Sequence, residues 1–303
     1  MEDLGRVSII LPTYNGSRFL RRSIDSCLNQ TYGNFELIIV DDGSTDTTKE
    51  IIGSYNDERI SYVRHEMNRG LSAALNTGFF KSSGKYLTWT SDDNYYSSNA
   101  IEKMITFLKE RACDFVYCDY CRFREDSVSD PVIVKLIDNL DLREENSIGS
   151  CFLYSRQVME SVGQYDQEAN LAEDYDYWLR ASKHFIFCHM NEPLYYYREH
   201  DHPSSPRQLE VRIASLLVLV KNNIMDSQEA TRRLIETIYW HSRLRRLGAV
   251  LLPYLSESIA KIFVKTIFAG RSERVLKEFE TGKIDFKTAR LTLIQITKGF
   301  GSG

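Results

Sequence analysis

The stretch Leu87-Thr88-Trp89-Thr90-Ser91-Asp92-Asp93-Asn94 joins an apolar, β-branched run to two adjacent carboxylates. The run predicts a buried strand, and a helical pattern follows from about Ser98, so the acids should lie where the strand ends. Ligands of α/β folds gather beyond the carboxyl ends of strands. Two adjacent acids repel each other unless a cation or several donors hold them, and their oxygens suit Mg²⁺ or Mn²⁺. The stretch therefore predicts a cation-binding turn, with an ordinary solvated turn as the alternative.

The chain before this stretch alternates between strand and helix. Apolar runs at residues 7–11, 35–40 and 60–64 predict strands, and helical patterns separate them. Such alternation indicates an α/β fold, a mainly parallel sheet with helices on both faces. Because the carboxyl ends of parallel strands share one edge, we expect the polar residues there to form one site. They are Pro12, Thr13, Tyr14, Asp41, Asp42, Arg69, Asp92 and Asp93.

Three of these residues have both a ligand-binding and a structural interpretation. Tyr14 can stack its ring on a nucleotide base or pack as an ordinary aromatic residue. Asp42 can accept a hydrogen bond from a pyrimidine N–H or cap a helix. Arg69 can offset the charge of a diphosphate or lie on the surface as a solvated charge. The sequence lacks Gly-x-Gly-x-x-Gly and the Gly-Lys-Ser/Thr phosphate loop, which argues against a nicotinamide enzyme or an ATPase.

Several motifs follow one another in a distinctive order. They are Ser8-Ile-Ile-Leu-Pro-Thr-Tyr-Asn-Gly16, Ser26-Cys-Leu-Asn-Gln-Thr-Tyr32, Phe35-Glu-Leu-Ile-Ile-Val-Asp-Asp-Gly-Ser-Thr-Asp46, Asn68-Arg-Gly-Leu-Ser-Ala-Ala-Leu-Asn-Thr-Gly78 and Ser91-Asp-Asp-Asn94. In these motifs the chain resembles the family 2 inverting glycosyltransferases of the GT-A fold, over roughly residues 6–205. The resemblance implies a Rossmann-like nucleotide-diphospho-sugar transferase fold, with a mixed, mainly parallel sheet flanked by helices.

The resemblance also implies a nucleotide-sugar donor, with UDP as the favoured nucleotide. Pro12, Tyr14 and Asp42 would bind its base side, and Asp92 would touch the ribose. Thr13 and Arg69 complete the expected donor site. Asp93 would hold a divalent metal, Mn²⁺ or Mg²⁺, under the diphosphate. The family often has Asp-x-Asp at this motif, whereas this chain has Asp-Asp-Asn, so the metal-binding role is carried over to Asp93.

A second acidic cluster, Glu173-Asp174-Tyr175-Asp176, stands at the predicted start of a helix that Trp178 and Leu179 anchor in the core. Acids at a helix start are favoured by the helix dipole, so simple capping is the alternative interpretation. A transfer that inverts the sugar carbon needs one fixed carboxylate to take the proton of the acceptor hydroxyl. In the resembling family this base is the second acid of a Glu-Asp pair. The resemblance implies that Asp174 is the base and that Glu173 supports it or contacts the acceptor. Asp176 is a weaker candidate for the base.

The stretch Pro193–Ser205 matches the Tyr-Arg-x-His ending that the family commonly has. Arg198 and His200 occupy the matching positions, and His202 is additional. We expect His200 to ligate the metal or touch the diphosphate, and we assign Arg198 and Trp178 to the acceptor side or its loop. The residues then fit two domains: a catalytic domain over 1–205, with a nucleotide-sugar half (1–97) and an acceptor half (98–205), and a helical region over 206–303.

The helical region has two interpretations. An apolar stripe that begins at Leu209 and Ile213 suits a small bundle, packed on the catalytic domain or on a second subunit. The apolar residues 247–268, with arginines on both sides, would also suit a basic surface that contacts a membrane carrying lipid-linked acceptors.

The composition fits a folded globular protein: 303 residues, 43% hydrophobic and 26% charged. A net charge of −4 gives no indication of nucleic-acid binding. The first residues lack the basic and apolar regions of a signal peptide, and no uncharged apolar run has the length of a membrane span. We expect a cytoplasmic protein, with the inner face of the membrane as a peripheral alternative. Its six cysteines, including the Cys118-Asp-Tyr-Cys121 pair, are expected to be reduced structural thiols.

The leading functional hypothesis is a metal-dependent inverting glycosyltransferase acting on a glycan or lipid-linked acceptor. A sugar-phosphate nucleotidyltransferase shares the sheet type, but such enzymes place a Gly-rich, Arg/Lys-bearing loop after the first strand, unlike Pro12–Gly16. A nucleotide-sugar-binding scaffold without catalysis is the other alternative, and the presence of Asp93 and Asp174 speaks against it.

Overall fold

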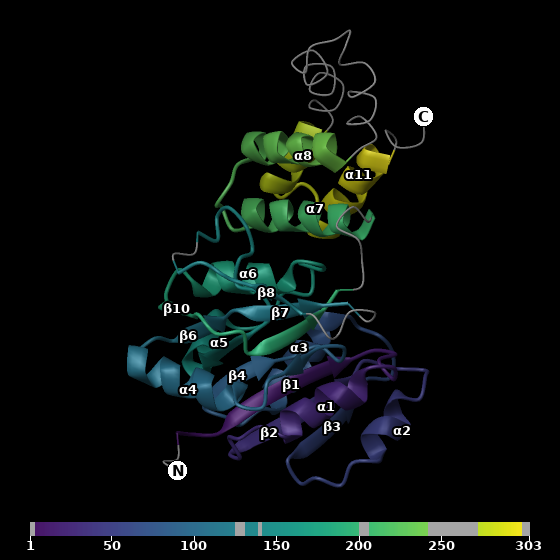
Figure 1. Ribbon diagram of the computed structural model, residues 1–303. Helices are drawn as coiled ribbons and strands as arrows, with labels where there is room; N and C mark the ends of the chain where they lie inside the picture. The colour runs from purple at the N-terminus through teal and green to yellow at the C-terminus, as the bar shows by residue number, and fades with distance from the viewer. Residues whose placement is uncertain (1–3, 125–130, 139–140, 200–205, 242–271, 299–303) are drawn as a thin grey trace. The chain divides into compact units, whose positions relative to one another are not determined.

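The computed structural model describes residues 4–124, 131–138, 141–199, 206–241 and 272–298 (Figure 1). The chain divides into two compact units. The first contains residues 1–167 and 180–200, and the second contains residues 168–179 and 201–303.

A seven-stranded sheet forms the centre of the first unit (Figure 1), in the order β10-β6-β9-β4-β1-β2-β3. Only β9 runs antiparallel to its neighbours. The strands are β1 (Val7–Thr13), β2 (Phe35–Asp41), β3 (Ile60–Arg64), β4 (Tyr86–Trp89), β6 (Phe115–Cys118), β9 (Phe152–Ser155) and β10 (Phe187–Met190). The prediction of a mixed, mainly parallel sheet flanked by helices is confirmed.

Helices cover both faces of this sheet, as the alternating pattern predicts. Val7, Ile9 and Leu11 of β1 share one core cluster with the apolar stripes of α1 and α4, which lie on the near side in Figure 1. Ile10 points to the other face, where Gly78 lets α3 pack closely against it. The helices are α1 (Leu20–Leu28), α2 (Thr48–Gly53), α3 (Leu71–Lys81), α4 (Ala100–Arg111) and α5 (Arg156–Val162).

A smaller four-stranded sheet, in the order β5-β11-β7-β8, also belongs to the first unit. Its strands are β5 (Tyr95–Tyr96), β7 (Tyr120–Phe123), β8 (Val132–Val134) and β11 (Tyr195–Arg198). The antiparallel pairing of β7 with β8 gives a hairpin in the irregular region after residue 122. Strand β5 follows the Asp92-Asp93 turn directly, so this sheet brings the end of β11 next to that turn.

The second unit is helical where the structure describes it. Its helices are α6 (Glu173–Ala181), whose last two residues belong to the first unit, α7 (Pro206–Lys221), α8 (Ser227–His241) and α11 (Phe286–Lys298), together with residues 272–280. Ile213 and Leu217 of the predicted stripe are buried. The predicted C-terminal helices are therefore present. The apolar residues 247–268 lie outside the described part of the chain. No described helix has both the length and the apolar character needed to cross a membrane.

One local expectation is wrong. The cysteines are not all reduced, because Cys113 and Cys188 form a disulfide. Strand β10 pairs with β6 at the sheet edge, which brings these two residues together across a sequence separation of 75. The other four cysteines are free and buried.

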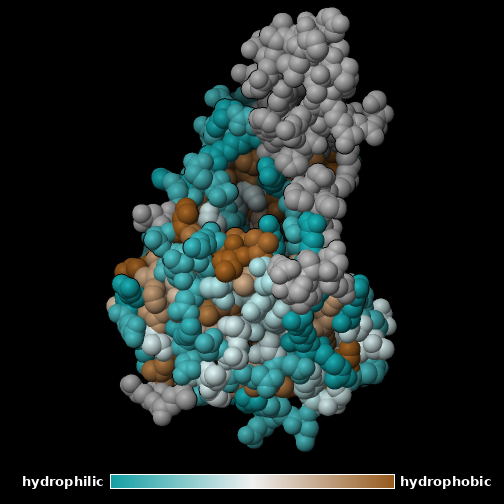
Figure 2. Space-filling view, viewed as in Figure 1, coloured by the Kyte–Doolittle hydropathy of each residue, from teal (hydrophilic) through white to brown (hydrophobic). Residues whose placement is uncertain are grey.

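The face seen in Figure 2 is mainly hydrophilic where it is coloured, with apolar areas in brown. Among the described residues, large exposed hydrophobic side chains include Tyr14, Phe80, Ile186 and, around β8, Val132, Ile133 and Ile137. Tyr14 is the one that belongs to the predicted site.

Candidate active site

The carboxyl ends of β1 to β4 bring several predicted site residues together. The register pairs Thr13 with Asp41 and Asp41 with Arg64. Beyond these ladders, the Asp42 N–H donates to the Thr13 carbonyl oxygen at 2.8 Å. Strands β1 and β4 pair Ile10 with Trp89, and the same offset places Asp92 beside Thr13. One edge of the sheet thus carries acids from the ends of two strands, β2 and β4.

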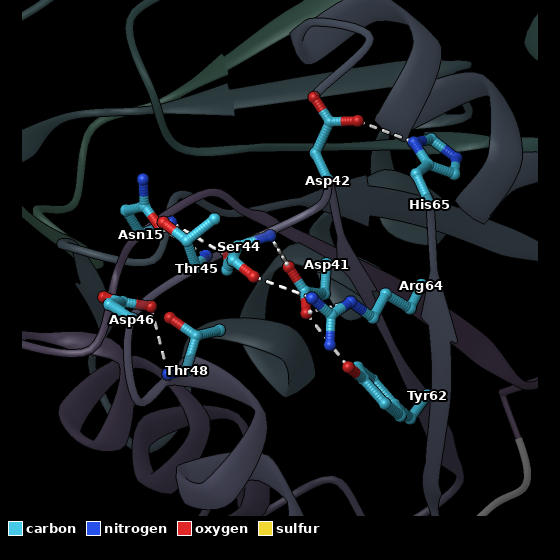
Figure 3. A network of polar contacts seen from close by, with 10 residues as sticks. All are labelled: Asn15, Asp41, Asp42, Ser44, Thr45, Asp46, Thr48, Tyr62, Arg64 and His65. Carbon is cyan, nitrogen blue, oxygen red and sulfur yellow. Dashed lines mark hydrogen bonds and ion pairs between the residues drawn. The ribbon is translucent and has the colours of Figure 1, made fainter. Parts of the chain in front are cut away.

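Asp42 is buried and receives N–H groups from two directions. Its Oδ1 lies 2.6 Å from His65 Nδ1 (Figure 3). The backbone N–H groups of Arg69 and Gly70 donate to the carboxylate at 2.8–3.0 Å. Because α3 begins at Leu71, these two N–H groups lie just before the helix, and Asp42 holds the loop that leads into it. These contacts also fix the carboxylate in place at the sheet edge.

Asp41 forms the adjoining part of the network in Figure 3. Its Oδ1 accepts from the Ser44 N–H at 2.8 Å, and its Oδ2 accepts from the Tyr62 hydroxyl at 2.9 Å. Arg64 contacts the same carboxylate at 3.5 Å and donates to the Ser44 carbonyl oxygen at 2.7 Å. The turn after β2 is therefore held from β3 and cannot swing freely away from the sheet.

Asp92 lies over the loop that follows β1. The Thr13 hydroxyl donates to Asp92 Oδ2 at 2.5 Å. A Cβ on Gly16 would come within 2.0 Å of the same oxygen, so only glycine leaves room for the carboxylate. Burial raises the pKa of Asp92 to about 6, and the charge of Asp93 adds to this, although the Thr13 hydroxyl and the Tyr14 N–H oppose the shift.

The Asp92-Asp93-Asn94 turn is fastened by residues from α1 and β11. Ser23 of α1 donates to the Ser91 carbonyl oxygen at 2.9 Å. The Arg198 N–H donates to Asn94 Oδ1 at 2.7 Å, and its Nε donates to the Asp93 carbonyl oxygen at 3.2 Å. The buried Arg198 guanidinium also lies 3.9 Å from the centre of the Phe19 ring. Arg198 was assigned to the acceptor side or its loop, and the structure places it against the acidic turn.

The remaining predicted residues of this edge differ in exposure. Pro12 is buried within β1, whereas the Tyr14 ring is 49% exposed. Arg69 is exposed and fixed through its backbone N–H on Asp42. The aromatic side chain of Tyr14 and the positive charge of Arg69 are thus accessible beside the fixed acids.

The acids of α6 belong to the second unit. Burial raises the pKa of Glu173 to about 7, and the charge of Asp174 adds to the shift. Asp174 Oδ1 accepts from the N–H of Tyr175 at 2.7 Å. Asp176 is fully buried and contacts Asn222 Nδ2 at 3.0 Å and Lys221 Nζ at 3.4 Å, which gives it a structural role. Trp178 is also fully buried and anchors the helix.

Sequence reasoning overlooked His65, Gly16 and Asn94. His65 follows β3 directly, so it stands at the same strand-end edge as the predicted acids, and that position was the available signal. Gly16 lies within a quoted motif, but its steric role depends on the placement of Asp92. His200 and His202 lie outside the described residues.

The side chains of Asp92 and Asp93 are chemically suited to bind a divalent cation. Both supply carboxylate oxygens, and a cation would relieve the repulsion that helps to raise the Asp92 pKa. Within the described ranges, no three His, Cys, Asp or Glu side chains gather as a metal site. Mg²⁺ is usually held by one or two carboxylates together with substrate phosphates. The pair therefore fits a cation shared with a diphosphate.

Comparisons with solved structures identify the fold. The fold is similar to TarS from S. aureus in complex with UDP, with a TM-score of 0.60 and 17% identity over 98% of this chain and 90% of that one. It is also similar to the mannosyltransferase PcManGT from Pyrobaculum calidifontis in complex with GDP-Man and Mn²⁺, with a TM-score of 0.61 and 17% identity over 97% and 86% of the chains. The fold is that of the GT-A glycosyltransferases, as predicted.

Sequence comparisons then give the family. The model of glycosyl transferase family 2 matches residues 8–163, and the chain belongs to this family of transferases. An uncharacterized glycosyltransferase of Rickettsia prowazekii is 37% identical over 185 residues, which are 57% of this chain and 58% of that protein. The chain thus spans less than two thirds of that relative's length.

Proposed function

We propose that the chain is a metal-dependent inverting glycosyltransferase that moves a sugar from a nucleotide-sugar donor, in first place a UDP-sugar, to a hydroxyl of a glycan or lipid-linked acceptor. The observation that carries this proposal is the gathering of Thr13, Asp42 and Asp92 at one edge of a parallel sheet. The ligands of the neighbours support a nucleotide-sugar donor: TarS was crystallised with UDP and UDP-GlcNAc, and PcManGT with GDP-Man and Mn²⁺.

The residues of the strand ends would bind the donor. Pro12 and Tyr14 would flank the base, with the exposed Tyr14 ring as the stacking surface. Asp42 would accept an N–H of the base, and Asp92, held by the Thr13 hydroxyl, would contact the ribose. Arg69 would offset the diphosphate charge.

Asp93 would hold Mn²⁺ or Mg²⁺, with His200 as a further ligand candidate. A cation bound there neutralises charge on the departing diphosphate. Arg198 keeps the turn that carries Asp93 in position through its hydrogen bonds to Asp93 and Asn94.

Asp174 would act as the general base. As the acceptor oxygen forms a bond to C1 of the sugar, its proton passes to the Asp174 carboxylate. The bond from C1 to the diphosphate oxygen breaks, and the nucleoside diphosphate leaves with the bonding electrons. A single displacement of this kind inverts C1. Glu173 retains its proton up to a pH of about 7, which limits the negative charge beside Asp174.

The helical region over 206–303 would serve the same reaction without supplying a reacting group. Its helices would pack on the catalytic part, join two copies of the chain or contact the inner face of a membrane that carries lipid-linked acceptors. The proposed location is cytoplasmic. The Cys113–Cys188 disulfide removes one argument for it, since reduced thiols were part of that expectation.

The proposal is tested by thermal unfolding of the full chain with a panel of nucleotide sugars, with and without Mn²⁺ or Mg²⁺. A bound donor raises the unfolding midpoint, and at a given concentration a tighter donor raises it more. Release of free nucleoside diphosphate that requires acceptor supports transfer. Release of pyrophosphate from a nucleoside triphosphate and a sugar phosphate would instead indicate a nucleotidyltransferase, and binding without turnover would indicate a scaffold.

A further inference from the structure

His65 is a buried titratable side chain to which the proposed transfer assigns no role. Only 8% of the residue is exposed, and its backbone N–H donates to the Asp41 carbonyl oxygen at 2.9 Å. The ring bridges two elements, because Nδ1 lies 2.6 Å from Asp42 Oδ1 and Nε2 lies 2.9 Å from Thr77 Oγ1 on α3. Figure 3 shows the imidazole turned toward the Asp42 carboxylate.

The two contacts define where the ring carries its proton. Asp42 Oδ1 also accepts from the Arg69 N–H, so the carboxylate acts as an acceptor and His65 Nδ1 must be the donor. In the neutral ring Nε2 then accepts, and the Thr77 hydroxyl supplies the hydrogen. A histidine tautomer is set by the hydrogen bond that its other nitrogen makes. Asp42 therefore fixes the tautomer that presents an N–H to it, and the Thr77 hydroxyl complements this tautomer by donating to Nε2.

The number of hydrogen bonds that Asp42 can still accept depends on the partners that it already has. An ionised carboxylate has about four acceptor positions and no hydrogen to donate. Among the described residues, three N–H groups make four contacts with it: those of His65 and Arg69 at Oδ1, and those of Arg69 and Gly70 at Oδ2. The Arg69 N–H is shared between the two oxygens, so three hydrogens serve four acceptor positions, and a ligand that binds there must bring the fourth hydrogen.

We propose that His65 is a positioning residue that, with Thr77, holds Asp42 as an acceptor-only carboxylate and thereby selects donors whose base presents a ring N–H. This inference rests on the proposed function. Uracil and guanine carry a hydrogen on the ring nitrogen of their pairing edge. In cytosine and adenine this nitrogen carries no hydrogen and is itself a hydrogen-bond acceptor. It would therefore face the Asp42 carboxylate, a second acceptor, without a hydrogen between them. A site built to accept a hydrogen bond rejects ligands that lack the donor.

The test measures the affinity of the full chain for UDP and CDP by calorimetry in the presence of Mn²⁺. The wild type should bind UDP at least about tenfold more tightly than CDP, which corresponds to the difference of one hydrogen bond. His65→Phe keeps a ring of similar size but no N–H. It should weaken UDP binding about tenfold and narrow the preference over CDP. His65→Asn keeps a donor near the Nδ1 position and should stay within about threefold of the wild type.

Two further variants separate positioning from folding. Thr77→Val removes the hydroxyl that holds the ring through Nε2, so it should change UDP affinity in the same direction as His65→Phe but by less, and it also serves if His65→Phe does not fold. His184→Phe alters a histidine that is exposed in the same unit and should change neither affinity. In transfer assays His65→Phe should raise the donor KM more than it lowers kcat.

Two results would overturn the inference while leaving the proposed function intact. One is equal binding of UDP and CDP by the wild type. The other is a lower unfolding midpoint for His65→Phe with unchanged UDP affinity and unchanged preference, which is what a purely structural histidine would give. Failure of the wild type to bind UDP, GDP or CDP would refute the proposed function itself.

Discussion

The acids at the strand ends and the acids at the start of α6 are held in different ways. Asp41, Asp42 and Asp92 receive hydrogen bonds from residues distant in sequence: Tyr62, His65 and Thr13. On α6, by contrast, Asp174 is contacted by the N–H of its own neighbour Tyr175. The strand-end acids are therefore oriented by the sheet, whereas Asp174 is oriented by its helix.

In the proposed mechanism, this difference separates the residues that bind the donor from the residue that takes part in the transfer. An acid fixed by several donors is preorganised, so ligand binding loses no free energy to the ordering of that side chain. A general base must take up a proton from the acceptor and release it again, so its loss affects the reaction step rather than the binding of the donor. We therefore expect changes at the strand ends to affect donor binding first, and changes at Asp174 to affect turnover first.

The largest effect is expected from Asp174→Asn. If Asp174 takes the acceptor proton, the amide cannot replace it, and kcat should fall by about 10²–10⁴. The donor-induced rise of the unfolding midpoint should persist, since the donor residues are untouched. Release of nucleoside diphosphate in the presence of acceptor measures the rate.

Asp176→Asn is the matched control on the same helix. Asp176 is fully buried beside Lys221 and Asn222, so its loss should lower stability and leave the rate per folded molecule near that of the wild type. If Asp174→Asn turned over normally while Asp176→Asn did not, the assignment of the base would be wrong.

The next largest effect is expected at Asp93. If Asp93 holds the metal as proposed, Asp93→Asn removes a charged oxygen ligand, so it should lower kcat/KM by about a hundredfold and weaken the response to Mn²⁺ or Mg²⁺. Chelation of divalent ions should reduce wild-type turnover in the same way, and added metal should restore it. Full activity of the wild type after chelation would count against the metal-dependent mechanism.

A moderate effect is expected when Gly16 acquires a side chain. A Cβ there would meet Asp92 Oδ2 at 2.0 Å and Thr13 Oγ1 at 2.5 Å, so the Asp92 carboxylate must move. Gly16→Ala should weaken donor binding about tenfold, as the loss of one well-placed hydrogen bond would. Gly33→Ala is the control, because nothing lies within 4 Å of its added Cβ. Equal donor affinity in both variants would show that the position of Asp92 does not matter for binding.

The sequence was most informative where the sheet register alone determines a contact. The apolar runs at residues 7–11 and 87–90 predict two strands, and the parallel pairing of Ile10 with Trp89 then leads to the contact between Thr13 and Asp92. The strand Ile60–Arg64 was predicted with its observed bounds.

Contacts that depend on side-chain packing or distant pairing were not predictable in this way. His65 reaches Thr77 only because α3 packs on the face of the sheet that carries Ile10. Cys113 meets Cys188 because β10 joins β6, a pairing that no local pattern indicates.

The smallest effect concerns stability and the other acid of α6. Burial raises the pKa of Glu173 from 4.5 to about 7, so the folded protein holds this proton more tightly than the unfolded chain. The resulting stabilisation is complete below pH 4.5 and is lost as pH rises through 7. Glu173→Gln cannot ionise, so it should be more stable than the wild type at pH 8, by on the order of 1 kcal/mol or a few degrees in Tm.

Thermal unfolding of both proteins from pH 4 to pH 8 gives this difference directly. The comparison must use the difference between the two curves, because Asp92, with a pKa of about 6, adds its own slope to both. Curves that run parallel across this range would mean that Glu173 ionises normally. It would then be a solvated capping acid at the start of α6, and Asp174 would carry out its proposed chemistry beside a second full negative charge.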